Sequence, residues 1–390
     1  MDNECALRPL PRECRVAHAA PSRRTAAFEV RFPFRQVIMR VLLLSAAVSL
    51  GLSGLAHASG VFIPIETPGV QLTKLSANGA YAVGTTFGGG GFRWVAATGA
   101  EEVLPEMPIA LGINNSGTIA GAVVTTVDGM EYQLGALLPQ GSTPTQLTSP
   151  LDDASNAYDV SDDGTAVGLS FVHDFSGRAI AFVWTAGEGM TALPVNRPDT
   201  YSRANVISAD GGTIAGWNDQ EDGSRTAVIW KDGVALDVVD RDGIAVGEAD
   251  GISVDGRYVV GSSYMDIEGN SGAWLRDGNT GSLVLRPVMT FAFGVTRDGG
   301  TVVGNTGFVD DPARAAVIWR KPVGSMLLAD FLADQQIAVP EEWDLSGGLT
   351  GISADGYTIV GWGTGPNGQS SYVIKLDKPD AVFADGFDPR

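Results

Sequence analysis

ISADGYTIVGW, residues 352–362, is one of several close copies of the same segment that recur along the chain. ISADGGTIAGW stands at 207–217, and ISVDGRYVVGS stands at 252–262. Each copy joins Asp-Gly, a dipeptide typical of a tight hairpin turn, to an apolar run that ends near a glycine. The chain therefore repeats one hairpin several times.

Aligning the chain on this turn gives seven units, which are about 46 residues apart on average. Their turn glycines are Gly79, Gly117, Gly164, Gly211, Gly256, Gly299 and Gly356. A repeat of this length is typical of propeller blades and related arrays.

Each unit contains the signals of four short strands. The second strand is a nearly unbroken apolar run such as YVVG or TIVG, which indicates burial on both faces. The third strand ends in an aromatic residue in most units, as in AFVW and AVIW, and a fourth strand follows, as in MTALPV. We therefore predict an all-β fold, a seven-bladed β-propeller of four-stranded antiparallel blades. The alternatives are an open β-array or two stacked sandwiches, and six or eight blades also remain open.

Two details refine this prediction. The first strand of a blade lies nearest the axis and should carry small residues, which fits the shared position of Gly112, Gly251, Gly294 and Gly351. The last unit lacks a fourth strand, and VFIPIE at 61–66 is a spare one that would close the ring. A rival closure would use AVFADGF at 381–387. LLADFLADQQ at 327–336 has apolar residues at helical spacing and predicts one short inserted helix.

Residues 1–58 are not expected to belong to the folded domain. Residues 39–58 have a basic start, an apolar run and the small-x-small triplet Ala56-His57-Ala58, which is the layout of a secretory signal peptide. Residues 1–38 are interpreted as an upstream or leader extension, residues 59–379 as a single propeller domain, and residues 380–390 as a C-terminal tail. The sequence therefore predicts a secreted, periplasmic or cell-surface protein.

The net negative charge of the chain disfavours some classes of binding partner. The whole chain has 45 acidic and 26 basic side chains, and the predicted mature part keeps 41 and 18 of them. Such an excess of negative charge repels nucleic acid and anionic lipid. The mature part has no cysteine, so no disulfide stabilises it, and it has no further apolar stretch long enough to span a membrane.

The repeat resembles the extracellular HAF repeat of bacterial secreted proteins, whose pattern joins an ISxDGxxIVG hairpin to a following AFxW. AIAFVW at 179–184 and GISADGYTIVGW at 351–362 carry the resemblance, and residues 326–368 are similar to the terminal repeats of that family. Unit 2 departs most, with MEYQLGALLP in place of the aromatic strand. The resemblance implies a secreted, propeller-like repeat protein and implies no particular activity.

No recognised catalytic motif is present in the sequence. G-x-S-x-G, H-E-x-x-H and a phosphate-binding loop are all absent, and His173, the single histidine of the mature part, is interpreted as a solvated loop residue. The Asp-Gly pairs are interpreted as turn chemistry.

The loops that join second and third strands vary in length and are polar, as binding loops on a rigid scaffold tend to be. In a propeller they lie together on one face, around the channel mouth. Their acids are the candidate ligand-binding residues: Asp174, Asp219, Glu221, Asp222, Asp266, Glu268, Asp310 and Asp311. These oxygen donors suit Ca²⁺ or a cationic ligand, and the plainer interpretation is a set of solvated loops in an acidic protein.

The sequence as a whole predicts a non-catalytic propeller that binds a protein, a surface polymer such as a polysaccharide, or a cation through this loop face. The alternative is a carboxylate-dependent hydrolase or lyase that acts on a polysaccharide or small substrate at the channel mouth. An enzyme requires at least two acids that converge in one pocket with unlike environments, whereas a binding protein requires only a broad patch.

Overall fold

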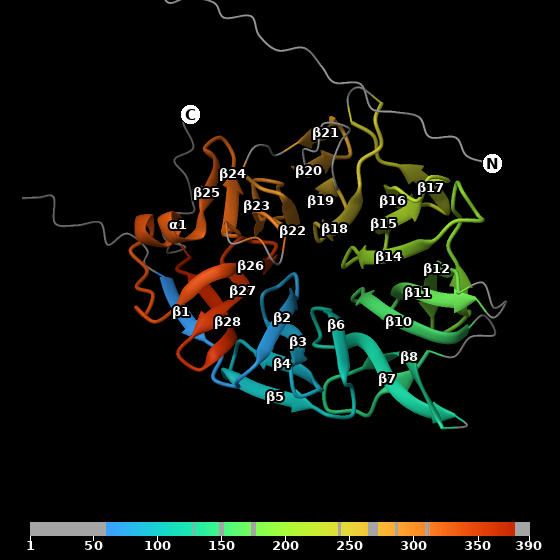
Figure 1. Cartoon of the computed structure of the whole chain (residues 1–390), viewed down its shortest axis with the longest axis horizontal. Coiled ribbons are helices and arrows are strands. Elements are labelled where there is room, and N and C mark those ends of the chain that lie inside the picture. Colours follow the sequence, from blue (N-terminus) through green and yellow to red (C-terminus); the bar gives the residue numbers. More distant parts are fainter. Residues whose placement is uncertain are drawn as a thin grey trace, which may run out of the picture. The chain divides into compact units, whose positions relative to one another are not determined.

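Seven four-stranded antiparallel sheets follow one another around a common centre (Figure 1), which confirms the predicted seven-bladed propeller. The structure is a computed structural model that describes residues 60–378 except 128, 148–151, 173–176, 241–242, 264–271, 285–287, 309–310 and 312. All of these residues belong to one compact unit, Ala56–Arg390. The predicted leader, signal peptide and tail lie outside the described residues.

Blades 1 to 6 each consist of four strands that are consecutive in the chain. Blade 1 has β2 (Val70–Leu75), β3 (Tyr81–Thr86), β4 (Gly91–Val95) and β5 (Ala100–Leu104). Blade 2 has β6 (Ile109–Ile113), β7 (Ile119–Val127), β8 (Met130–Leu138) and β9 (Thr145–Gln146). Blade 3 has β10 (Asp152–Val160), β11 (Ala166–Val172), β12 (Ala179–Thr185) and β13 (Gly189–Ala192).

The second half of the ring repeats this arrangement. Blade 4 has β14 (Ser202–Ile207), β15 (Thr213–Asp219), β16 (Arg225–Lys231) and β17 (Val234–Asp237). Blade 5 has β18 (Glu248–Ile252), β19 (Tyr258–Ser263), β20 (Gly272–Asp277) and β21 (Gly281–Val284). Blade 6 has β22 (Phe291–Val295), β23 (Thr301–Asn305), β24 (Ala316–Arg320) and β25 (Gly324–Leu327).

The ring closes through a strand from the other end of the domain. Blade 7 has β26 (Asp344–Ile352), β27 (Thr358–Gly365) and β28 (Gly368–Leu376), and its fourth strand is β1 (Gly60–Pro64). β1 pairs antiparallel with β28, from Gly60 opposite Leu376 to Pro64 opposite Tyr372. The prediction that 61–66 closes the ring is confirmed, and the rival segment 381–387 lies outside the described residues.

The core is divided among the junctions between blades. Seven clusters of buried apolar side chains each join one blade to the next. In the cluster between blades 5 and 6, for example, Val260 packs with Ala292 and Val302, all of them fully buried. Burial between two neighbouring sheets is the reason that the second strands are apolar on both faces.

Hydrogen bonds of the Ser/Thr and Asp side chains stabilise the repeated turn. In blade 4 the Ser208 hydroxyl donates to Asp210 Oδ1 at 2.6 Å, and the same Oδ1 accepts the amide of Gly212 at 3.0 Å. The hydroxyl bond from Ser208 lowers the pKa of Asp210. Gly211 follows with φ of +75°, a left-handed conformation that favours glycine. These contacts confirm the interpretation of this Asp-Gly pair as turn chemistry.

A β-bulge interrupts the first strand of every blade at the same repeat position. The register between first and second strands shifts between Leu72 and Lys74 in blade 1, and between Ala204 and Val206 in blade 4. The other five blades show the same shift. A bulge adds an unpaired residue and re-aims side chains. The bulged residues are Thr73, Leu111, Tyr158, Asn205, Asp250, Phe293 and Thr350.

The position after the bulge is glycine in four units, as predicted, but blades 1 and 3 place charged residues there. Lys74 Nζ lies 2.6 Å from Asp159 Oδ2, so this ion pair connects blades 1 and 3 across blade 2. Gly112 of blade 2 leaves room for the pair, because a Cβ there would lie 2.8 Å from Asp159 Oδ1. The space among the first strands at this level is only about 70 Å³.

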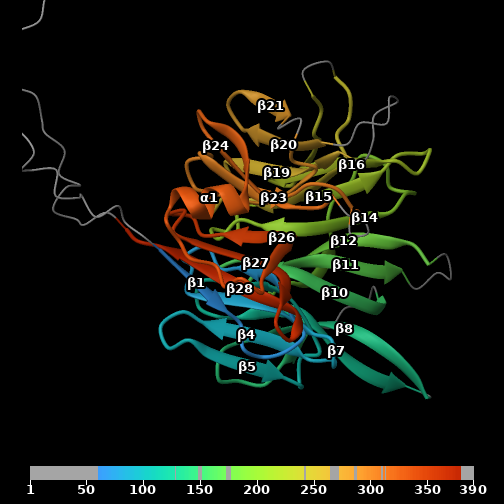
Figure 2. The same cartoon turned by 60° about the vertical axis from the view of Figure 1, so that its left-hand side comes forward.

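One short helix, α1 (Leu328–Asp334), follows β25 and contacts β24 and β25 (Figure 2). It begins after Leu327 and buries Leu328, Phe331 and Leu332. The helix predicted within 327–336 is confirmed. Within the described residues, no helix has the length and apolar character needed to cross a bilayer.

Candidate binding face

The blades present two different ends. We call the end with the Ser/Thr-x-Asp-Gly hairpins the turn face, and the end with the loops between second and third strands the loop face. Antiparallel pairing puts these two connections at opposite ends of each blade. Of the predicted acids, Asp219, Glu221, Asp222 and Asp311 are described at the loop face, whereas Asp174, Asp266, Glu268 and Asp310 lie outside the described residues.

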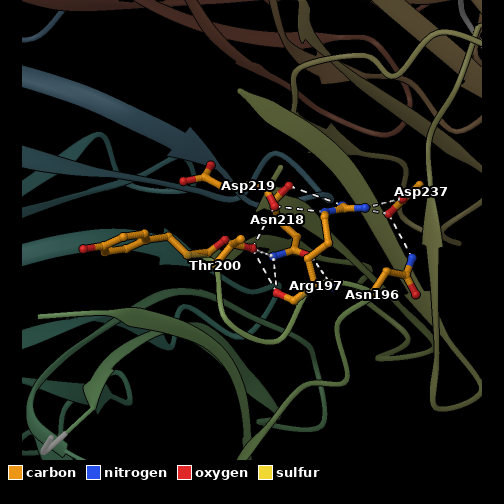
Figure 3. A network of polar contacts seen from close by, with 7 residues as sticks. Asn196, Arg197, Thr200, Asn218, Asp219 and Asp237 are labelled. Carbon is orange, nitrogen blue, oxygen red and sulfur yellow. Dashed lines mark hydrogen bonds and ion pairs between the residues drawn. The ribbon is translucent and has the colours of Figure 1, made fainter. Parts of the chain in front are cut away.

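Asp219 ends β15 beside a polar network that anchors the connection from blade 3 to blade 4 (Figure 3). Arg197 donates from Nη1 to Asp237 Oδ2 at 2.7 Å and from Nε to the backbone oxygen of Asp219 at 2.9 Å. Thr200 Oγ1 donates to that same oxygen at 2.7 Å and accepts from Asn218 Nδ2 at 2.8 Å. The network uses the Asp219 backbone and leaves its carboxylate out.

The remaining described acids of these loops are at the surface. Asp222 Oδ1 accepts from the amide and hydroxyl of Ser224, at 2.9 and 2.6 Å, and the hydroxyl bond lowers the pKa of Asp222. Asp311 Oδ1 accepts the amide of Ala313 at 2.8 Å. Glu221 is exposed. Among the described residues, no group of three or more His, Cys, Asp or Glu side chains is arranged to hold a metal ion. The Ca²⁺ site stays a prediction.

The loop-face end of blade 4 carries an arginine between aromatic rings. The guanidinium carbon of Arg203, on β14, lies 4.8 Å from the ring centre of Tyr158 and 5.4 Å from that of Trp217. Arg225 covers the same indole, with its guanidinium carbon 4.3 Å from the ring centre. Arg203 Nε also donates to Asn205 Oδ1 at 2.6 Å. Such cation–π contacts hold both guanidinium groups in place.

Blade 5 supplies the carboxylates that face these arginines. Glu248, whose side chain is only 4% exposed, pairs with Arg203 at 3.4 Å and closely with Arg225. Asp250, the bulged residue of β18, accepts from the Ser262 hydroxyl at 2.7 Å. Burial raises the pKa of Asp250 to about 6, against the opposing effects of Ser262, Arg203 and Arg225. Burial also raises the pKa of Asp219, opposed by Arg225 and Arg197.

Several polar atoms here are buried without a partner among the described residues. Trp217 Nε1 and Asp219 Oδ1 are two of them, and both side chains lie on the same face of β15. Such groups reduce stability and are uncommon in folded proteins, which makes this region the candidate site. We name the set Tyr158, Arg203, Trp217, Asp219, Arg225, Glu248 and Asp250 the channel wall.

Asp250→Asn should therefore stabilise the protein, and the gain should depend on pH. The folded-state pKa of Asp250 lies above the ordinary value of 3.8, so protonation favours the folded state and this contribution is lost as the pH rises through 6. Asparagine does not ionise and still accepts the Ser262 hydrogen bond. We expect a gain of up to about 3 kcal/mol at pH 8 and a clearly smaller one at pH 5, measured by urea denaturation. An equal gain at both pH values would contradict the assignment.

Sequence reasoning identified Asp219 and missed the rest of the channel wall, although a signal was present. Arg203 and Glu248 each stand eight residues before the turn glycine of their unit, and Asp250 and Tyr158 each stand six before theirs. Among the residues that the seven units have eight and six positions before the turn glycine, only Arg203, Glu248 and Asp250 are charged. The pairing of these positions between neighbouring blades depends on the ring and its bulges.

No family model and no curated protein matches this chain. Among solved structures, the β-propeller domain of the Trilobed protease from Pyrococcus furiosus is 11% identical, covers 80% of this chain and 99% of that one, and gives a TM-score of 0.52. RRP9 WD40 repeats are 12% identical, with 82% and 99% covered and a TM-score of 0.48. TolB from Acinetobacter baumannii is 12% identical, with 79% of each chain covered and a TM-score of 0.43.

At 11% identity, the similarity to the Pyrococcus furiosus domain shows a shared fold alone. The Pyrococcus furiosus domain is described as having an open velcro topology, whereas β1 pairs with β28 here and closes the ring. The chain therefore belongs to the class of closed seven-bladed β-propellers.

Proposed function

We propose that this protein is a non-catalytic propeller that binds a cationic partner, a polypeptide or polymer segment with amino or guanidinium groups, through its loop face. The proposal rests on the acidic side chains of the channel wall and of the loop between β15 and β16. The channel wall contains Asp219, Glu248 and Asp250, and the loop that follows Asp219 adds the exposed Glu221 and Asp222. Burial raises the pKa values of Asp219 and Asp250. Arg203 and Arg225 only partly offset the charge of these acids.

The proposal agrees with three further properties of the chain. The acidic excess of the whole chain, 45 against 26 side chains, attracts cations over a distance. A rigid ring presents its loops without a large ordering cost on binding. The export that residues 39–58 predict would bring the protein to partners outside the cytoplasm, including surface polymers.

A lysine octapeptide is a suitable probe for the predicted face. Glu221→Gln with Asp222→Asn removes two charges from the loop face, and Asn keeps the local turn because its amide oxygen accepts like that of Asp. We expect this double variant to bind the peptide roughly fivefold more weakly, because two exposed charge pairs with the peptide are lost. Fluorescence anisotropy at low and physiological salt measures the change.

The matched control removes two charges from the turn face. Glu188 and Asp232 are exposed in hairpins between third and fourth strands, and Asp232 has φ of +51°, which asparagine tolerates. Glu188→Gln with Asp232→Asn should leave peptide binding nearly unchanged. Equal weakening by both double variants would show general attraction to an acidic protein and would contradict a specific face.

A further inference from the structure

A second hollow lies on the outer part of the ring, away from the channel wall. It has a volume of about 620 Å³ and is bordered by α1, the segment that follows α1, the start of β26 and the residues just before β24. Its walls are mainly apolar, formed by Leu328, Leu332, Ile337, Val339, Pro340 and Trp343 among others. This size and lining are typical of sites for small molecules.

Arg314 is the cationic side chain of this cavity. Its Nε and Nη1 atoms are buried and donate no hydrogen bond to any described residue. The guanidinium carbon lies 5.0 Å from the ring centre of Trp362. The backbone beside it is fixed, because the amide of Ala315 donates to Thr306 Oγ1 at 2.8 Å and the amide of Arg314 donates to the backbone oxygen of Asp311 at 3.0 Å.

The charge of Arg314 lacks a counter-charge within the described part of the chain. No described carboxylate forms an ion pair with it, and burial alone lowers its pKa from the ordinary value. Two acids border the same cavity, Glu341 and Asp344. Asp344 accepts instead from the amide and hydroxyl of Ser346, at 2.9 and 3.0 Å. An unneutralised guanidinium that is partly buried is unfavourable, and an anion beside it would relieve this.

We propose that this cavity binds a carboxylic acid with an extended apolar body. The ligand's carboxylate pairs with Arg314, because the geometry of a guanidinium group matches that of a carboxylate. Its apolar part lies against α1 and the Ile337–Pro340 segment. A neutral apolar molecule would leave Arg314 unpaired, and a sugar or free phosphate would leave the apolar walls in water. Arg314 belongs to the β23–β24 loop of the same face, but the site is independent of the channel wall, since it uses blades 6 and 7 and the opposite sign of ligand charge.

Decanoate, kept below its micelle concentration, is the probe for the full chain. Titration calorimetry and the fluorescence of the tryptophans, of which Trp343 borders the cavity, both report binding. Decanol has the same body without the charge, and decylamine reverses the charge. We expect decanoate to bind at least about tenfold more tightly than either.

Two variants test the two parts of the ligand. Arg314→Gln should weaken the binding of decanoate about tenfold or more and leave the binding of decanol unchanged. Arg297 is an exposed arginine of the turn face, and Arg297→Gln should change the binding of neither ligand. Ala329→Trp fills the cavity from an exposed position of α1 and should weaken the binding of decanoate and of decanol alike. Arg314→Gln should also raise Tm without ligand.

Absence of decanoate binding would overturn the proposal. So would binding that Ala329→Trp does not affect, and so would equal binding of decanoate and decanol that Arg314→Gln leaves unchanged. Because lysine-peptide binding is measured separately, failure here is distinguishable from failure of the proposed function.

Discussion

Gly304→Ala should destabilise the propeller by about 3 kcal/mol or more. Gly304 is the glycine that ends the apolar run TVVG in β23, and a Cβ there would lie 1.8 Å from the carbonyl oxygen of Phe291. That oxygen belongs to β22, just before the bulge, and it is held by the strand pairing of blade 6. Neither backbone can move away without breaking the sheet.

The same contact occurs in every blade, which explains why the apolar runs end in glycine. A Cβ at Gly121, Gly168, Gly216 or Gly261 would lie 1.9 to 2.0 Å from a first-strand carbonyl oxygen. The bulge brings the two strands so close that only a hydrogen fits. The glycine in the repeat is thus required by packing, in addition to the turn glycine that is required by φ.

Gly187→Ala is the matched control for Gly304→Ala. Gly187 lies in the hairpin between β12 and β13, and a Cβ there would meet no atom within 4 Å. Thermal denaturation should show Tm lowered by roughly 5–10 °C for Gly304→Ala and changed little for Gly187→Ala. Equal Tm values for the two variants would mean that the strands of blade 6 are further apart than described.

Deletion of residues 60–66 should remove the cooperative unfolding transition. β1 supplies the fourth strand of blade 7, and it buries Phe62 and, just after the strand, Ile65. The Phe62 ring lies 5.0 Å from the ring centre of Tyr372 and 5.3 Å from that of Trp343. Loss of one such aromatic side chain costs about 3–5 kcal/mol, and total stability is about 5–15 kcal/mol.

The deletion would also expose the edge of β28 along its pairing with β1, and an open edge promotes aggregation. Scanning calorimetry and light scattering measure the two consequences. Deletion of residues 379–390, which contain the rival closing segment, should leave Tm almost unchanged. A chain that keeps its transition without 60–66 and loses it without 379–390 would reverse the assignment of the closing strand.

The fold was predictable because the chain consists of seven repeat units with similar local signals. The Asp-Gly turn, the apolar run and the aromatic strand each occur in nearly every unit, so one weak hairpin signal becomes a strong one. VFIPIE was identified as the closing strand because one unit was a strand short. The helix was identified from apolar spacing alone, and its bounds differ by only one or two residues.

The functional surfaces were predictable only in part. Asp219, Glu221 and Asp222 were placed on the correct loop, but no sequence pattern indicated that the Asp219 carboxylate would be buried next to Arg225. Arg203 and Glu248 are 45 residues apart, and they meet only because neighbouring blades align their equivalent positions. The cavity beside Arg314 depends on where α1 packs, which periodicity does not determine.

The sequence pattern predicted the turn that starts each hairpin, the seven repeat units and a spare strand for ring closure, because these signals lie within a few residues of one another. The structure settled the number of blades at seven and the closing strand as Gly60–Pro64. Which polar side chains meet, and which have no partner among the described residues, followed from the three-dimensional packing of the blades. Those contacts depend on the bulge that re-aims one residue per blade and on the packing of sheets distant in the chain, so no local pattern contains them.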